Sequence, residues 1–330
     1  MEVAEHYTWD VQDSSKIQDF MTCPRMYFFR HVLGWRREEP NVHLIFGQAV
    51  HLAMERIYPT GSKPDFSPLA IVEGFEAFKT CYRASFSDLS DDENAPKTPA
   101  NFLRALPLYA ATYKHLDTFD VLHSEVAGSV MVSDKRLIYF KIDTVGESKE
   151  DGLFILEHKT SGRFSSAWAN QWSQKTQVNA YTYALSMLYP DRDTYGVKIN
   201  GLFIKNPPGV KKDGTPKANA TDTEFHRIPI QKTIPQLEEW LWNINFWLEF
   251  IEIEFDNLDL VNPDDDLMLA FPKNTESCSK YFGCPFRDYC LAWLNPLRKC
   301  KQPPLGFIEE HWDPRSKQEN AKEVVKLCHS

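Results

Sequence analysis

Two acidic residues lie at close spacing in the segment 140–160. Asp143 lies in one run rich in Ile, Leu, Phe, Tyr and Val, Glu157 lies in a second such run, and a polar, Gly-containing segment separates the two runs. Runs of this kind around a short turn segment are typical of a β-hairpin. A turn centred near Glu150 would place Asp143 opposite Glu157, where two like charges about 5 Å apart at Cβ destabilise a sheet. A divalent cation between the carboxylates would remove that repulsion.

The carboxylates of Asp143 and Glu157 offer oxygen ligands, which suit Mg²⁺ or Mn²⁺ better than zinc. Such an ion can activate a water molecule and neutralise charge that develops on a phosphoryl group. Lys159 follows Glu157 by two residues and therefore projects from the same face of the strand. Its ammonium could orient the water or stabilise the transition state. The alternative is an exposed strand end whose Asp, Glu and Lys pair on the surface.

Further polar residues fall on helical stripes that are otherwise apolar. Gln177 and Tyr181 lie one turn apart on a helix expected over 166–188. Their polar groups either line the active site or mark a helix that begins in solvent. His51 lies on the apolar stripe of a helix expected over 44–58, where it is either a metal ligand or a hydrogen-bonded core histidine.

The cysteines form a further candidate site. The chain has seven cysteines and no export signal, which argues against a disulfide framework. Cys278, Cys284 and Cys290 are spaced six and six residues apart, and Cys23 lies far upstream. Four thiolates could hold an iron–sulfur cluster or zinc and join the two ends of the chain. The alternatives are that these cysteines are buried and unligated, or that Cys300 replaces one of them.

The elements that must position these residues follow a clear order along the chain. The 330 residues, of which 42% are hydrophobic, suffice for a sizeable core. Helices are predicted at 14–33, 44–58, 68–86, 98–119, 166–188 and 234–256. Strands are predicted at 121–132, 137–145, 153–160, 195–205 and 223–230. We expect one integrated α/β domain made of a helical N-terminal region (1–120), a core (121–257) and a cysteine segment with a helical tail over 316–330 (258–330).

Charge and hydropathy limit the kinds of partner that the chain can have. No apolar run approaches the roughly 20 residues that span a bilayer, and the N-terminus lacks the pattern of a signal peptide. We therefore expect a cytoplasmic protein without a membrane partner. The net charge of −9 argues against a simple basic-surface nucleic-acid binder. A positive groove remains possible, because Arg36-Arg37 and the segment 298–301 are locally basic.

Several short motifs now stand in a recognisable order. They are Cys23-Pro24 after Ser15 to Phe20, Gly47 followed by His51, Asp143 followed by Glu157-His158-Lys159, Gln177 with Tyr181, and Cys284 to Cys290. In this order they resemble the motifs of the PD-(D/E)XK nuclease superfamily, specifically its RecB-like branch. This branch includes recombination nuclease domains and the CRISPR-associated adaptation nucleases that carry iron–sulfur clusters.

The resemblance implies a restriction-endonuclease-like core, in which a central mixed sheet is flanked by helices. It implies His51, Asp143, Glu157 and the backbone carbonyl of His158 as metal ligands, Lys159 as catalytic lysine, Gln177 and Tyr181 as supporting residues, and Cys23, Cys278, Cys284 and Cys290 as ligands of a structural 4Fe–4S cluster. Five residues separate Cys278 from Cys284, however, where members of the family commonly have two. Structural zinc is the alternative.

The activity implied by the resemblance is that of a Mg²⁺- or Mn²⁺-dependent DNA nuclease. We expect an exonuclease that hydrolyses phosphodiester bonds of single-stranded DNA or DNA ends in recombination, repair or DNA processing. A helicase or recombinase is the protein partner to look for. The alternative is a catalytically silent, nuclease-like protein that binds DNA or serves as a scaffold of a recombination complex.

Overall fold

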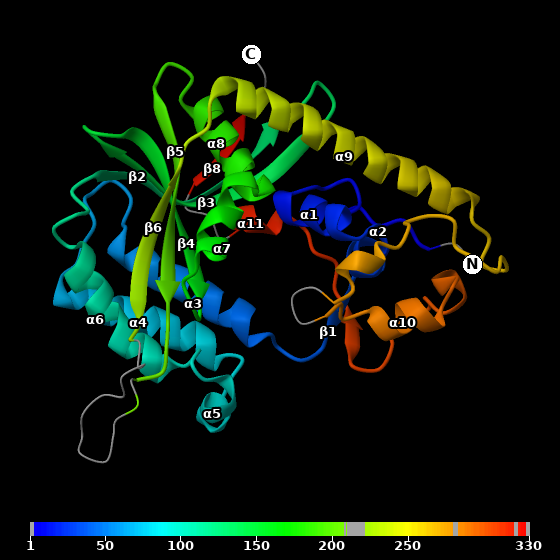
Figure 1. Cartoon of the computed structure of the whole chain (residues 1–330), viewed down its shortest axis with the longest axis horizontal. Helices are drawn as coiled ribbons and strands as arrows, with labels where there is room; N and C mark the ends of the chain where they lie inside the picture. Colours follow the sequence, from blue (N-terminus) through cyan, green and yellow to red (C-terminus); the bar gives the residue numbers. More distant parts are fainter. Residues whose placement is uncertain (1–2, 208, 210–221, 280–282, 320–322, 328–330) are drawn as a thin grey trace.

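A computed structural model describes residues 3–207, 209, 222–279, 283–319 and 323–327 of the chain. Its centre is a six-stranded mixed sheet with the strand order β6-β5-β4-β3-β2-β8 (Figure 1). The strands are β2 (Asp120–Met131), β3 (Leu137–Ser148), β4 (Gly152–Ser161), β5 (Thr194–Phe203), β6 (Glu224–Ile230) and β8 (Glu323–Leu327). The pairs β4–β5 and β2–β8 are parallel and the other pairs are antiparallel. This sheet, with helices on both sides, confirms the predicted fold class.

One layer of helices covers the sheet on the side of α3 (Val42–Ile57), α4 (Pro68–Arg83) and α6 (Pro99–Tyr113). Each of these helices begins at a side-chain cap, and Pro68 and Pro99 occupy first-turn positions where no N–H is needed. The core of this layer is aromatic, as in the Phe78 and Phe102 rings, which stack 4.2 Å apart. It packs on one side of β4 through Phe154 and Leu156.

The second layer consists of α1 (Ser14–Thr22), α8 (Thr176–Leu188) and α9 (Ile234–Leu260). It packs on Ile155 of β4, which projects opposite to its neighbours because side chains alternate along a strand. The helix α9 begins with a capping box formed by Thr233 and Gln236. Its inner edge buries Trp240, Ile244, Leu248 and Ile251. The two layers therefore divide one core into two parts.

Shorter elements complete the chain. They are α2 (Pro24–Tyr27), the π-helical turn Phe28–Val32, α5 (Asp91–Asn94), α7 (Ser166–Asn170), α10 (Arg287–Ala292), α11 (Ser316–Glu319), the 3₁₀ turns Asp88–Ser90, Gln171–Gln174, Thr275–Ser277 and Pro296–Arg298, and the antiparallel pair β1 (Trp35–Arg37) and β7 (Phe307–Glu309). Within the described residues, no helix combines the length and apolar character needed to cross a bilayer.

Three predicted helices differ from the structure. The helix over 14–33 breaks at Cys23, because Pro24 lacks the N–H that a continuous helix requires. The helix over 166–188 is divided into α7, a 3₁₀ turn and α8. The prediction of a helical tail over 316–330 is wrong for its described part: α11 is one turn long, and β8 then pairs with the outer edge of β2.

Candidate active site

A row of three carboxylates crosses the centre of the sheet. The β3–β4 register ends at the pair Thr144 and Leu156, so Asp143 and Glu157 are the next two opposing positions, where the strands separate. This register corresponds to the predicted turn centred near Glu150. On the other side of β3, the register places Glu125 of β2 opposite Asp143. Three strands thus bring Glu125, Asp143 and Glu157 into one line.

Asp143 is held by two donors from different elements. Its Oδ1 lies 2.9 Å from Nδ1 of His51 on α3, and its Oδ2 accepts a hydrogen bond from the His158 N–H at 2.8 Å. Burial alone would raise the pKa of Asp143, but His51 overcomes this effect and holds the pKa well below its usual range. Burial likewise lowers the pKa of His51, but the Asp143 carboxylate outweighs it and raises the pKa to about 9. Without metal, the two form an ion pair.

Glu157 is a buried carboxylate whose charge is poorly compensated in the metal-free protein. Burial, followed by the like charge of Asp143, raises the pKa of Glu157 to about 7 despite the opposing effect of Lys159. Its Oε1 accepts hydrogen bonds from Nζ of Lys159 at 2.6 Å and from Nε2 of Gln177 at 3.2 Å. Its Oε2 is buried and has no hydrogen-bond partner among the described residues. A buried oxygen of this kind fits a metal ligand, because buried polar atoms otherwise find partners.

The helix α8 holds the Glu157 carboxylate from the side. Nε2 of Gln177 also lies 2.9 Å from the hydroxyl of Tyr181, and that hydroxyl donates to the backbone carbonyl of Lys141 on β3. The glutamine and the tyrosine therefore join α8 to both strands of the hairpin. The structure thus brings both predicted residues to the site. There they contact the Glu157 carboxylate and the β3 backbone, and so they position the site.

The imidazole of His158 lies outside this group. Its Nδ1 lies 2.8 Å from Nδ2 of Asn200, and burial lowers the pKa of the ring to about 3, so that the ring is neutral. The same Asn200 amide donates to the hydroxyl of Tyr109 on α6. The side chain of His158 thus joins β4 to β5 and the helical layer, and a metal-binding role for this residue would belong to its backbone carbonyl.

Glu125 is a candidate ligand that sequence reasoning missed. The possible ligand atoms of His51, Glu125 and Asp143 all lie within 4.8 Å of one another. Among the described residues, no other three His, Cys, Asp or Glu side chains come this close together, and Glu157 is not part of this group. Glu125 has φ of 57°, a conformation that non-glycine residues rarely adopt and that clusters at functional sites. Its carboxylate pairs with Nζ of Lys141 at 2.7 Å. Pairing the predicted strands 121–132 and 137–145 as a hairpin would have found it.

This site can hold a hard divalent cation. The donor set of two carboxylates, Glu125 and Asp143, and the imidazole of His51 suits Mg²⁺ or Mn²⁺. The reactive side is open to solvent, because the side chains of His51 and Lys159 retain 29% and 22% of their exposure. A bound phosphodiester could therefore meet the cation and the lysine together.

The four predicted cluster cysteines also meet, at a second place. Cys23, Cys278, Cys284 and Cys290 line one cavity of about 230 Å³ between α2 and the segment that follows α9. Burial raises the pKa values of the Cys284 and Cys290 thiols. Cys300 and Cys81 do not line this cavity, and Cys328 lies outside the described residues.

A buried arginine accompanies the cysteines. Arg25 lines the same cavity and donates from Nε to the Phe271 carbonyl at 2.9 Å and from Nη2 to the carbonyls of Met268 and Ala270. Its Nη1 is also buried but finds no acceptor within the described parts of the chain. A cation with an unused donor would favour a negatively charged occupant in the cavity.

This fold and this site define a class of α/β proteins whose metal site lies where two central strands of a mixed sheet separate. The model of the PD-(D/E)XK nuclease superfamily matches residues 14–291, and the chain belongs to this superfamily. Its members are generally nucleases, use divalent metals and act on DNA. No curated protein matches the sequence. Among solved structures, one titled "Crystal structure of SSO0001" is 16% identical over 66% of this chain and 81% of that chain, with a TM-score of 0.29.

Proposed function

We propose that the protein is a Mg²⁺- or Mn²⁺-dependent deoxyribonuclease of the RecB-like branch. It acts as an exonuclease on single-stranded DNA or DNA ends during recombination, repair or DNA processing, and a helicase or recombinase delivers its substrate. The observation that carries the proposal is the buried Oε2 of Glu157 beside Asp143 and Lys159, for which the described part of the chain supplies no hydrogen-bond partner. Buried polar atoms usually find a hydrogen-bond partner, so an oxygen aimed into the site without one is better explained by a metal ligand than by the ion pair with Lys159 alone.

Each residue of the site has a distinct role in this proposal. His51, Asp143, Glu157 and the carbonyl of His158 hold the cation, and Glu125 adds a further carboxylate. When bound, the cation supplies an activated water molecule and neutralises charge on the phosphoryl group. Lys159 stabilises the charge that develops on the phosphate oxygens. Gln177 and Tyr181 keep Glu157 in place.

Aromatic rings next to Lys159 support a preference for single strands. The Lys159 ammonium lies 5.7 Å from the ring centroid of Trp172, whose ring packs against Trp168 at 5.3 Å. Both rings are partly exposed. Unpaired bases stack on aromatic side chains with little dependence on sequence. A strand whose phosphate meets Lys159 can therefore place a base on this pair of rings.

The cysteine cavity supports an iron–sulfur cluster over zinc. Tetrahedral zinc with Zn–S bonds near 2.3 Å would bring sulfur atoms to roughly 3.8 Å from one another. Within the described residues, no three of the cysteine sulfurs lie as close together as this. A 4Fe–4S cluster holds its thiolates further apart and carries negative charge, which suits Nη1 of Arg25, for which the described residues supply no acceptor. Its role is structural, because hydrolysis transfers no electrons.

Replacement of the catalytic lysine tests the nuclease proposal. We expect Lys159→Ala to keep the fold and Mn²⁺ binding but to lose at least about 10²–10³-fold in cleavage rate, as expected for removal of a charge-stabilising donor. The measurement is cleavage of 5′- and 3′-labelled single-stranded DNA with Mg²⁺ or Mn²⁺. Lys79→Ala on α4, whose exposed ammonium pairs with Glu76 on the same helix, is the control and should cleave normally.

Two outcomes would contradict this proposal. Cleavage in Mg²⁺ at the wild-type rate by Lys159→Ala would remove the lysine from the mechanism. DNA binding by the wild-type protein with no cleavage in either metal would instead support the catalytically silent scaffold. The two labels also give the polarity of cleavage, because an exonuclease shortens one end first.

A further inference from the structure

A second row of polar residues crosses the sheet beside the row of carboxylates. The strand registers place His158 of β4 beside Asn200 of β5, and Asn200 beside Arg227 of β6. The side chains of His158 and Asn200 are buried, and that of Asn200 is fully enclosed. Earlier positions on the same face of β4, Phe154 and Leu156, are apolar and pack in the core. The face therefore becomes polar where β4 reaches the candidate metal site.

The amide of Asn200 has only one orientation that satisfies its neighbours. Its Oδ1 accepts from Nε of Arg227 at 3.3 Å, and because an arginine nitrogen never accepts, the amide oxygen must face the guanidinium. The Nδ2 group then donates to Nδ1 of His158 and to the Tyr109 hydroxyl, both at 2.8 Å. The hydrogen bond that holds the His158 ring thus has a fixed direction.

Two tyrosine hydroxyls continue this chain of hydrogen bonds. The Tyr58 hydroxyl donates to the Asp117 carboxylate at 2.7 Å, so its oxygen is the acceptor for the Tyr109 hydroxyl 2.6 Å away. Tyr109 in turn accepts from Asn200. Nη2 of Arg227 holds the same Asp117 oxygen at 2.6 Å. Every donor therefore points toward one buried ion pair, and hydrogen bonds aligned in this way strengthen one another.

The backbone of His158 is part of the candidate metal site. Its N–H donates to Oδ2 of Asp143 at 2.8 Å, and its carbonyl is a proposed metal ligand. Glu157 and Lys159 are its direct neighbours in the chain. The ring and both peptide groups of His158 share one Cα, so a ring that is held in place restricts how far these peptide groups can tilt. The buried row can therefore fix the geometry of the ligands.

We propose that Asn200 is a positioning residue of the metal site. This inference rests on the proposed metal-dependent nuclease. In it, Asn200 holds the His158 ring, and through that ring it orients the N–H that binds Asp143 and the carbonyl that faces the cation. Residues that orient metal ligands typically contribute about 10- to 100-fold to metal affinity or activity. A row that only joined α6 and β6 to the sheet would affect stability alone.

Replacement of the Asn200 amide tests this role. Asn200→Leu keeps the approximate size of the side chain but removes both donors. We expect this variant to bind Mn²⁺ about 10- to 100-fold more weakly than the wild type, as measured by electron paramagnetic resonance of the free ion. Its cleavage rate should return toward the wild-type value when the Mn²⁺ concentration is raised. Lys159→Ala should show no such recovery, because it lacks a charge that Mn²⁺ concentration does not replace.

A double-mutant cycle tests whether the His158 ring transmits the effect. His158→Phe keeps a ring in the interior but offers no acceptor to Asn200, and it should weaken Mn²⁺ binding by a similar factor. Adding Asn200→Leu to this variant should weaken Mn²⁺ binding little further, because residues that act through one contact are not additive. Urea unfolding measures the stability of each variant separately from its Mn²⁺ affinity.

The matched control is another buried amide of the same helical layer. Nδ2 of Asn101 on α6 donates to the Pro96 carbonyl at 3.0 Å and to Oδ1 of Asn206 at 2.9 Å. Asn101→Leu therefore also removes two donors from a buried place. It should lower the stability of the protein but keep the wild-type affinity for Mn²⁺.

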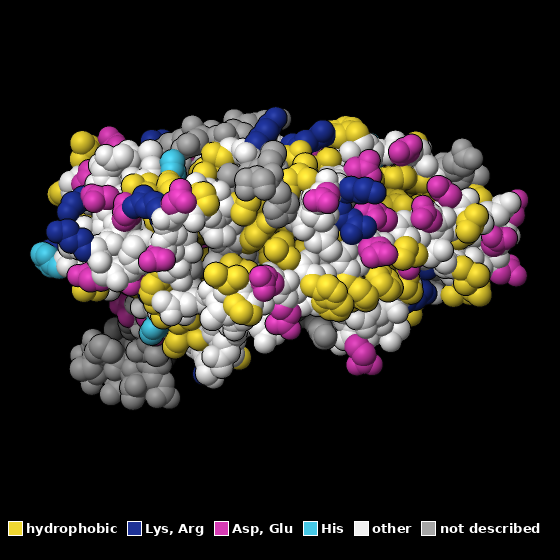
Figure 2. Space-filling view, turned by 90° about the horizontal axis from the view of Figure 1, so that it is seen from above, with side chains coloured by type: hydrophobic (Ala, Val, Ile, Leu, Met, Phe, Trp, Pro, Cys, Tyr) yellow, Lys and Arg dark blue, Asp and Glu magenta, His cyan; other side chains and the backbone are white. Residues whose placement is uncertain are grey.

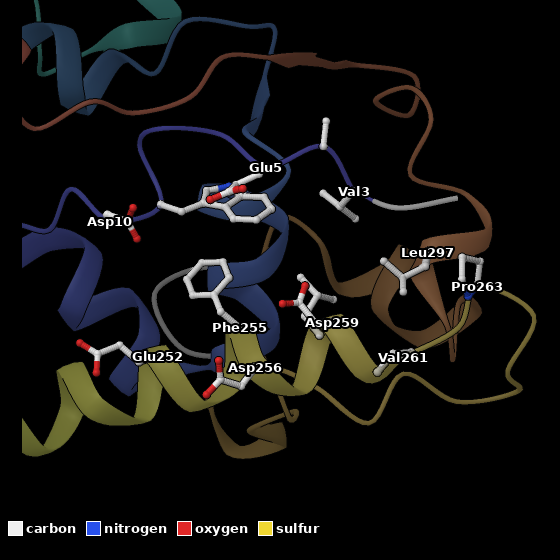
Figure 3. Close-up of a pocket in the computed structure, with 13 residues that line it drawn as sticks. Val3, Glu5, Asp10, Glu252, Phe255, Asp256, Asp259, Val261, Pro263 and Leu297 are labelled. Atoms are coloured by element: carbon white, nitrogen blue, oxygen red, sulfur yellow. The ribbon is translucent and has the colours of Figure 1, made fainter.

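A second control accounts for Mn²⁺ bound at acidic residues elsewhere. Figure 2 shows acidic side chains on the side of the molecule on which α9 lies in Figure 1. A cavity of about 660 Å³ beside α9 also brings Asp256 and Asp259 opposite Glu5 and Asp10 (Figure 3). Asp256→Asn with Asp259→Asn removes two of these charges and should leave the tight binding of Mn²⁺ unchanged.

The outcomes separate this inference from the proposed function. Wild-type Mn²⁺ affinity in folded Asn200→Leu or His158→Phe would overturn the positioning role. It would also be overturned by a double variant in which the two losses multiply, or by an equal loss of Mn²⁺ affinity in Asn101→Leu. A wild-type protein that neither binds Mn²⁺ nor cleaves DNA would instead contradict the nuclease proposal, and this inference with it.

Discussion

At the scale of single residues, Glu157 combines its proposed role as a metal ligand with a cost in stability. An ordinary glutamate ionises near pH 4.5, whereas burial and Asp143 raise the pKa of Glu157 to about 7 in the metal-free protein. The folded state therefore binds this proton more tightly than the unfolded chain does. Its contribution to stability falls as pH rises from about 4.5 through 7, because the folded protein must then hold a buried, poorly compensated charge.

We therefore predict that Glu157→Gln stabilises the metal-free protein at high pH. At pH 8 in EDTA, its free energy of unfolding should exceed that of the wild type by about 1–3 kcal/mol, since each unit of pKa shift corresponds to about 1.4 kcal/mol. At pH 5 the difference should nearly vanish. Urea unfolding at the two pH values measures both. Asp143→Asn is the opposite control, because it removes an acceptor of His51 and His158 and should destabilise the protein.

At the scale of elements, the sequence predicted what depends on local order. The hairpin of β3 and β4 follows from two apolar runs around a turn near Glu150, so the juxtaposition of Asp143 and Glu157 was accessible. The pairing of Glu125 with Asp143 was accessible in the same way, from the neighbouring strands β2 and β3. The break at Cys23 depends on a single residue, Pro24. The helical spacing of the apolar residues continues past it and therefore does not reveal the break. The pairing of β8 with β2, by contrast, depends on a neighbour far away in sequence. Side-chain periodicity carries no information about such partners.

The junction between the helical layer and the sheet depends on such a distant contact. Both terminal guanidinium nitrogens of Arg227 on β6 pair with Asp117, with Nη2 2.6 Å from Oδ2. The Tyr58 hydroxyl at the end of α3 donates to the same oxygen at 2.7 Å. The Asp117 side chain is almost fully buried. Nothing in the local pattern of either segment marks this pair.

We predict that Asp117→Ala destabilises the protein by about 3–5 kcal/mol, because it leaves the Arg227 guanidinium in the interior without a counter-charge. Urea unfolding measures the loss. Asp88→Ala removes an exposed carboxylate that pairs with Arg83, and its effect should be much smaller. Similar losses in the two variants would show that the buried pair does not hold the α3–α6 layer on the sheet.

At the scale of the whole molecule, the segment after α9 lies beside the first helices at the cysteine cavity. The segment after α9 returns to the first helices, where the Arg25 N–H donates to the Pro272 carbonyl at 3.1 Å and Nδ2 of Asn274 donates to the Thr22 carbonyl at 2.9 Å. The Asn274 N–H lies 3.4 Å from Sγ of Cys23. These contacts lie on either side of Cys23, so a segment near the start and a segment near the end of the match to the nuclease superfamily meet beside the cavity.

An iron–sulfur cluster bound by these cysteines would add its binding free energy to the free energy of unfolding. Protein purified without oxygen should be brown and contain iron, whereas a zinc protein would be colourless. We predict that Cys23→Ser loses most of its iron and about 2.7 kcal/mol or more of stability, the loss expected when a ligand present at 100 times its dissociation constant no longer binds. Cys81→Ser, on α4 and away from the cavity, should keep its iron and its unfolding midpoint. Full iron content and stability in Cys23→Ser would mean that the cluster, if present, does not join the two ends of the chain.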